Sequence, residues 1–178
     1  DKILYAQWSQ DSYSIIWDTH GGTNASTPQS TYTYHGTIAD PGNPSRTGYN
    51  FAGWWTTQST GGVQYVFPYT TSSTTSLTIH ARWTPIVYNI TFDEHGGSTV
   101  SDATYTIGTT ISSPTTTRNG YTFTGWWTLA SGGSKIDFTS YPSNGTTGDI
   151  ALHAQWTPIV YNVTYDENGG SFEANGVS

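Results

Sequence analysis

Hydrophobic and polar residues alternate with a period of two along several short stretches of the chain. In the stretch that begins at Tyr88, polar residues separate the apolar Tyr88, Ile90 and Phe92. Successive side chains of a β-strand point to opposite faces, so this period is typical of a strand with one face in a core and the other in solvent. The stretches that begin at Tyr13 and Tyr161 show the same pattern.

A second type of stretch, at 77–83 and 150–156, also alternates. Its apolar positions fall on one face and end on a tryptophan, Trp83 or Trp156. His80 and His153 fall on the opposite, polar face. The pattern predicts a strand in which each histidine stands alone and solvated.

These stretches belong to a repeated unit. YSIIWDTHGG from Tyr13 returns as YNITFDEHGG from Tyr88 and YNVTYDENGG from Tyr161, and RTGYNFAGWWT from Arg46 returns as RNGYTFTGWWT from Arg118. The tryptophan-ended stretch follows in each copy and also opens the chain, as LYAQW. Three motifs in one order at a near-constant spacing indicate tandem repeats.

The motifs divide the chain into two complete repeats, two joints and two partial repeats. Both joints have the sequence TPIV, which is too short for a flexible linker. The segments are the tail of a preceding repeat (1–12), the first complete repeat (13–83), a joint (84–87), the second complete repeat (88–156), a second joint (157–160) and the head of a following repeat (161–178).

Paired glycines follow the opening strand of each copy and predict a turn. The residue before them is His20, His95 or Asn168, all types that tolerate a positive φ. A metal site is a second interpretation of the acidic and histidine residues here. Because the residue types change between copies, we favour the turn and expect no metal.

The predicted fold class is mainly β, or α+β with minimal helix. No segment has the pattern of an amphipathic helix, and the best candidates for a single helical turn lie near Asp137–Tyr141 and Phe67–Thr71. A bulge at Gly53 is needed to turn Trp54 inward, which leaves Trp55 outward. The same reasoning applies to the second copy, so the tryptophans expected in the core are Trp54, Trp83, Trp126 and Trp156, and the outward ones are Trp55 and Trp127.

Composition excludes several functions. Charged residues make up 10% of the chain, the net charge is −7 and there are five Lys and Arg residues, so nucleic-acid binding is not expected. The absence of cysteine excludes disulfides and thiolate chemistry. No apolar run is long enough to span a bilayer, and no nucleophile stands beside a base. We expect no enzyme activity, no cofactor and no membrane insertion of this segment.

In combination, TFDEHGG, RNGYTFTGWW and LHAQW resemble the Listeria–Bacteroides repeat, the family of the internalin B-repeat. The resemblance covers nearly the whole chain. It implies tandem β-grasp-like (ubiquitin-like) rolls that act as stalk or interaction modules of extracellular, mostly bacterial surface or secreted proteins, without catalysis.

Two functions remain open from the sequence. The first is a spacer or adhesion module of a surface protein. The second is a module that binds glycans or host-surface molecules through Trp55 and Trp127; the alternative for these residues is packing on a sheet face. The partial repeats also suggest head-to-tail self-association through 1–12 and 161–178, with packing on the adjacent complete repeat as the alternative.

Overall fold

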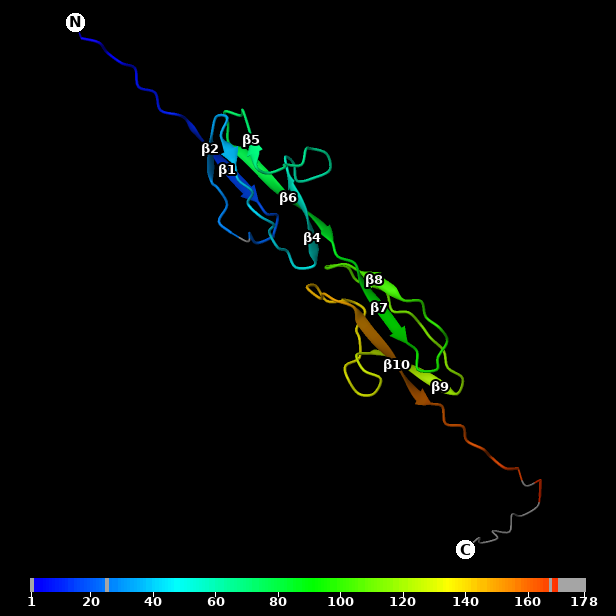
Figure 1. The fold of residues 1–178 in the computed structure, drawn as a ribbon. Coiled ribbons are helices and arrows are strands. Elements are labelled where there is room, and N and C mark those ends of the chain that lie inside the picture. Colours follow the sequence, from blue (N-terminus) through cyan, green and yellow to red (C-terminus); the bar gives the residue numbers. More distant parts are fainter. Residues whose placement is uncertain (1, 25, 167, 170–178) are drawn as a thin grey trace. The chain divides into compact units, whose positions relative to one another are not determined.

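The computed structural model describes residues 2–24, 26–166 and 168–169. These residues form ten β-strands and no helix (Figure 1). Neither candidate segment therefore forms a helical turn. At the first position the Asp137 carboxylate accepts a hydrogen bond from the Thr139 amide at 3.0 Å and closes a tight turn. At the second, strand β5 (Tyr69–Thr70) takes the place of the helical turn. No described helix is long and apolar enough to cross a bilayer.

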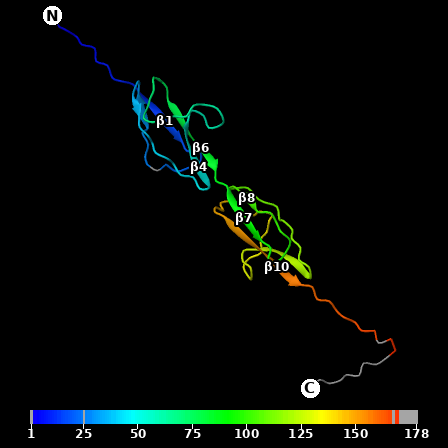
Figure 2. The ribbon, with the colours of Figure 1, turned by 45° about the vertical axis from the view of Figure 1, so that its right-hand side comes forward.

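The first repeat contains a four-stranded sheet in the order β2-β1-β6-β4. Its two central strands, β1 and β6, run parallel, with Ile15 opposite Leu77, and each has an antiparallel neighbour outside it. Figures 1 and 2 show these central strands side by side from two directions. A two-stranded sheet, β3 with β5, completes the repeat. The bounds are β1 Ser12–Asp18, β2 Thr31–Thr33, β3 Thr37–Ile38, β4 Tyr49–Trp55 and β6 Leu77–Pro85.

The second repeat has a four-stranded sheet in the order β8-β7-β10-β9. Strand β7 pairs antiparallel with β8, with Tyr88 opposite Tyr105. Strand β10 pairs antiparallel with β9, with Ala154 opposite Trp126. The bounds are β7 Tyr88–Asp93, β8 Ala103–Tyr105, β9 Tyr121–Trp127 and β10 Ile150–Pro158.

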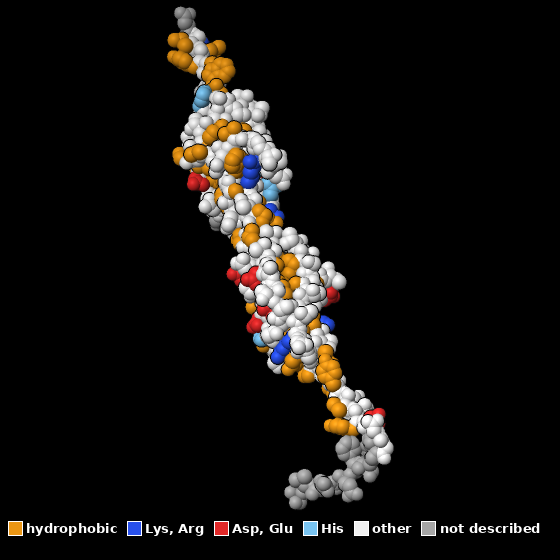
Figure 3. Space-filling view, turned by 90° about the vertical axis from the view of Figure 1, so that its right-hand side faces the viewer, with side chains coloured by type: hydrophobic (Ala, Val, Ile, Leu, Met, Phe, Trp, Pro, Cys, Tyr) orange, Lys and Arg blue, Asp and Glu red, His pale blue; other side chains and the backbone are white. Residues whose placement is uncertain are grey.

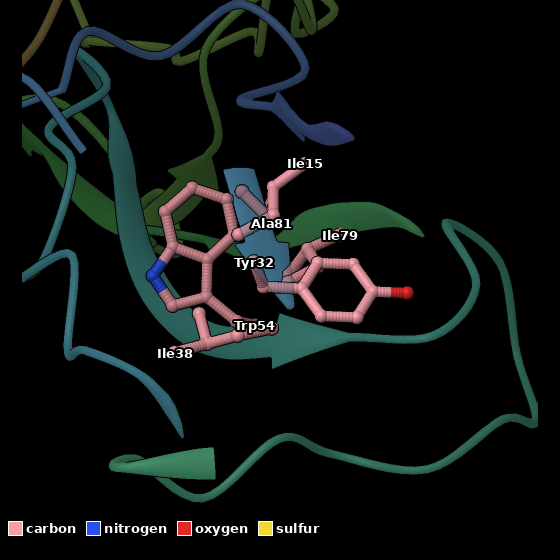
Figure 4. Packing of buried hydrophobic residues seen from close by; sticks show 6 residues of the cluster. All are labelled: Ile15, Tyr32, Ile38, Trp54, Ile79 and Ala81. Atoms are coloured by element: carbon pink, nitrogen blue, oxygen red, sulfur yellow. The ribbon is translucent and has the colours of Figure 1, made fainter. Parts of the chain in front are cut away.

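The core of the first repeat forms around one tryptophan. Trp54 is 3% exposed, and its ring meets Trp17 and Phe51 edge-on, with centroids 5.0 and 5.4 Å away. Its Nε1–H donates to the Gly42 carbonyl at 3.1 Å, so no polar atom of the ring is left unpaired. Figure 4 shows the buried cluster: Ile15, Tyr32, Ile38, Trp54, Ile79 and Ala81.

Trp54 faces inward because the strand is bulged. The register of β4 against β6 shifts between Phe51 and Trp54, and Gly53 has a φ of 102°, a conformation that side chains rarely adopt. In the second repeat Gly125 has a φ of 125° and Trp126 is 1% exposed. The predicted bulge and the predicted burial of Trp54 and Trp126 are confirmed.

Trp83 and Trp156 are half-buried, so the expectation that they are fully buried is wrong. Each lies near the end of its strand, where the ring covers the turn after the opening strand. Trp83 Nε1–H donates to the Thr19 carbonyl at 2.9 Å, and Trp156 Nε1–H donates to the Glu94 carbonyl at the same distance.

This contact explains the paired glycines. Gly21 has a φ of 84°, and a Cβ on Gly22 would lie 2.4 Å from Trp83 Cζ2. In the second repeat, a Cβ on Gly97 would lie 2.5 Å from Trp156 Cζ2. The first glycine is therefore required by backbone conformation and the second by the ring that rests on it.

We predict that Trp54→Ala destabilises the first repeat by about 3–5 kcal/mol, because it leaves a cavity at the centre of the core. Urea denaturation followed by circular dichroism measures the loss. Val66→Ala is the control, because Val66 is 77% exposed. Equal transitions for the two variants would contradict the central place of Trp54.

We predict that Gly22→Ala costs about 1–3 kcal/mol by overpacking against the Trp83 ring. In a Trp83→Ala background the same change should cost much less, since the ring it would meet is gone. A double-mutant cycle measures this coupling. Additive effects would show that Gly22 is needed for another reason.

Candidate functional site

The structure brings two histidines and an aspartate together in the first repeat. Asp18 is the last residue of β1, His20 lies in the following turn, and His80 lies on β6. Parallel pairing places Asp18 directly opposite His80. Directly opposed residues of neighbouring strands point to the same face of a sheet, so the turn has only to bring His20 over that face.

The three side chains are close enough to interact. His20 Nε2 lies 3.0 Å from His80 Nδ1, and the two rings are stacked with centroids 5.2 Å apart. Asp18 Oδ1 lies 3.3 Å from His20 Nδ1, and Asp18 Oδ2 lies 3.6 Å from His80 Nδ1. The histidine side chains are 15% and 22% exposed, so the cluster is partly shielded but open to solvent.

The second repeat builds the same cluster from Asp93, His95 and His153. His95 Nε2 lies 3.1 Å from His153 Nδ1, and the rings stack at 5.3 Å. Asp93 Oδ2 lies 3.5 Å from each of these two nitrogens. In the part of the chain that the structure describes, these are the two places where at least three His, Asp or Glu ligand atoms come within 4.8 Å of one another.

The expectation that His80 and His153 stand alone is therefore wrong. The turn interpretation of the other residues agrees with the structure: His20 and His95 both have a φ of 48°, and the Asp18 and Asp93 carboxylates accept their backbone N–H at 3.0 and 3.1 Å. Period-two alternation carries no signal for the parallel pairing that completes the cluster. The expectation of no metal stays a prediction.

A shallow groove lies beside the cluster in each repeat. In the first repeat it has a volume of 360 Å³, and its lining includes His20, Arg46 and Trp83. The groove of the second repeat has a volume of 450 Å³, and its lining includes the equivalent His95 and Arg118.

The lining arginines are held by neighbouring tyrosines. The guanidinium of Arg46 lies 4.0 Å from the centre of the Tyr49 ring, and that of Arg118 lies 3.9 Å from the centre of the Tyr121 ring. Cation–π stacking of this kind fixes a positive charge beside each groove.

The tryptophans expected to bind, Trp55 and Trp127, are both half-buried. The Arg82 guanidinium stacks on Trp55 at 4.1 Å from the ring centre, and Trp55 Nε1–H donates to the Ala52 carbonyl at 3.0 Å. Trp127 Nε1 is buried and has no hydrogen-bond partner among the described residues. Their role in binding stays a prediction.

The sequence matches the Listeria–Bacteroides repeat domain at residues 13–82 and again at 88–155. Among curated proteins, internalin H of Listeria monocytogenes is 32% identical over 83% of this chain and 25% of its own length. A protein of Evansella cellulosilytica described as a Gly-rich membrane protein is 30% identical over 94% of this chain and 19% of its own length.

The chain thus spans a quarter or less of the length of these relatives. The two matches fall on the two units that the motifs define and together cover most of the chain. The chain belongs to the Listeria–Bacteroides repeat family.

Proposed function

We propose that the chain is a non-catalytic spacer of an extracellular bacterial surface protein, with its repeats linked in series by stiff joints. The observation that carries the proposal is the structure of the joint. Strand β6 ends at Pro85 and β7 begins at Tyr88, so two residues separate the strands of successive repeats.

The joint is also tied to the repeat that it leaves. The Ile86 amide donates to the Gly48 carbonyl at 2.9 Å, and the Ile159 amide donates to the Gly120 carbonyl at 2.9 Å. The same hydrogen bond occurs at the same position in both copies. It restrains the backbone of the joint, whereas a flexible linker would lack such a bond. A short, hydrogen-bonded joint favours a fixed spacing over a swivelling one.

The relatives support the location. They include an internalin and a protein described as a Gly-rich membrane protein, which agrees with a role at the cell surface. We also propose that each repeat is a β-grasp-like roll. The parallel pair at the centre of the first sheet, flanked by antiparallel strands, supports this topology.

The joint can be tested with spin labels, since the chain has no cysteine of its own. Labels on Ser72→Cys and Ser131→Cys, both exposed positions in different repeats, report the distance between repeats by electron double resonance. We expect a narrow distance distribution, and a much broader one after insertion of Gly-Ser-Gly-Ser between Ile86 and Val87. If the distance distribution of the chain without the insertion is as broad as that of the chain with it, the proposed spacer function is wrong.

Carbohydrate binding is the second candidate. In the first repeat Arg82 covers one face of Trp55, so that face cannot stack on a sugar ring. The equivalent residue in the second repeat is Gln155, whose amide donates to the Leu129 and Gly132 carbonyls. Replacement of the guanidinium favours Trp127 as the residue that contacts a glycan.

Calorimetric titration with cell-wall and host-surface glycans tests this candidate. We expect Trp127→Ala to abolish any binding, because the stacking surface is lost, while Trp55→Ala leaves binding intact. Glycan binding that survives Trp127→Ala would exclude Trp127 as the contact residue, and no binding by the unmodified chain would exclude this second function.

We also propose head-to-tail association through 1–12 and 161–178, of which 1, 167 and 170–178 lie outside the described residues. Leu4 is 92% exposed and Val163 71%, whereas their counterparts in complete repeats, Leu152 and Ile90, are fully buried. Figure 3 shows apolar side chains on both segments. A second copy could cover these faces by the pairing that joins β1 to β6. Such a contact would form open chains.

Sedimentation velocity at rising protein concentration measures this association. We expect the sedimentation coefficient to increase with concentration, and the increase to vanish in Leu4→Ser or Val163→Ser because an apolar contact is removed. Val66→Ser, at an exposed position within the first repeat, is the control. A chain that remains monomeric at every concentration would exclude the contact.

A further inference from the structure

We propose that each Asp–His–His cluster binds a divalent transition-metal ion, with zinc as the expected occupant. The ligand atoms in the second repeat are His95 Nε2, His153 Nδ1 and one Asp93 oxygen. In the first repeat they are His20 Nε2, His80 Nδ1 and Asp18 Oδ2.

In the second repeat the two Asp93 distances fit a shared ion better than direct hydrogen bonds, whereas the His95–His153 distance fits either a hydrogen bond or a shared ion. His95 Nε2, His153 Nδ1 and Asp93 Oδ2 form a triangle with sides of 3.1, 3.5 and 3.5 Å. A direct charge-assisted N–H···O bond is shorter, about 2.7–2.9 Å. A tetrahedral ion with ligand bonds of about 2.0–2.1 Å holds its ligand atoms about 3.3–3.4 Å apart.

The first repeat adds a carboxylate contact on the far side of one ring. Asp18 Oδ1 lies 3.3 Å from His20 Nδ1, while His20 Nε2 faces His80 at 3.0 Å. A proton on Nδ1, on the side of the carboxylate, leaves the Nε2 lone pair free for a metal. Carboxylates orient metal-ligating histidines in this way in many sites. Asp18 Oδ2 remains on the side of His80 as the third ligand.

The position of the cluster allows an ion to enter. Asp18 and Asp93 are 40% and 54% exposed, and the first histidine of each cluster lines a groove. Three protein ligands leave a fourth position for water. Arg46 lies beside the turn glycine and in the same groove, and its positive charge weakens binding.

The two histidines occur as a pair. Both complete repeats contain them, and the partial copies have Asn168 in place of the turn histidine and Tyr5 in place of the strand histidine. A ligand role for the pair accounts for this pattern.

Ligand type sets the selectivity. Two imidazoles with one carboxylate suit zinc, nickel or copper, whereas calcium and magnesium prefer sites built wholly of oxygen. A bound ion would tie the turn after the first strand to the last strand of the same repeat. Units of this size bury a modest fraction of their surface, and this chain has no disulfide to hold them together. The metal would supply that cross-link.

Calorimetric titration of the whole 178-residue chain with zinc chloride tests the proposal. We expect two zinc ions per chain, and no heat from calcium or magnesium. Free zinc at a hundred times Kd should raise Tm by about 10–20 °C, and EDTA should reverse the rise. Long-range ¹H–¹⁵N spectra should show the ring signals of the four cluster histidines shifting with zinc.

Asparagine variants assign the sites, because asparagine tolerates the same backbone conformation and already stands at 168. His20→Asn and His95→Asn should each lose one zinc, and the double variant should lose both. Asp18→Asn keeps an acceptor for the turn but removes the charge, so it should weaken binding to the first repeat.

His35→Asn is the matched control. His35 also has a positive φ, 56°, but it is exposed and lies outside both clusters, so its replacement should leave both zinc ions bound. If zinc does not bind the unmodified chain, or if two ions still bind the double variant, the clusters are hydrogen-bonded turns and the proposal is wrong. Neither outcome bears on the proposed spacer function, because that proposal rests on the structure of the joint.

Discussion

The parallel pairing of β1 with β6 is the interaction on which the first repeat depends. It joins the first and last strands of the unit, with Ile15 opposite Leu77 and Asp18 opposite His80. Closing so long a loop costs conformational entropy. Burial of the apolar face that the paired strands share offsets this cost. Ile15 and Ile79 lie in that face beside Trp54. Without this pairing, neither strand would have a partner for its inner edge.

The same pairing determines what lies at the end of the sheet. Because β6 continues past the end of β1, Trp83 reaches the turn and rests on Gly22. The polar face of the two strands meanwhile carries Asp18 and His80 to one point. A single register thus creates both the glycine requirement of the turn and the histidine cluster, on opposite faces of one strand pair.

Local sequence patterns predicted much of the fold. Period-two alternation located the opening and closing strands, and the position of Gly53 between Phe51 and Trp54 predicted the bulge. The patterns did not show which strands pair, because alternation fixes the faces of a strand but not its neighbours. For that reason His80 was expected to be solvated alone. Trp83 was expected to be buried because its face is apolar, although its place near the strand end leaves it half-covered.

The parallel arrangement also determines how a repeat would respond to tension. The chain enters β1 at its amino end and leaves β6 at its carboxyl end, and in neighbouring parallel strands these two points lie at opposite ends of the pair. A pull along the chain therefore puts the hydrogen bonds between β1 and β6 under shear, so that all of them bear the force at the same time. It does not open them one after another, as in a hairpin pulled from its free ends. A link between Asp18, His20 and His80 would lie across that same pair of strands.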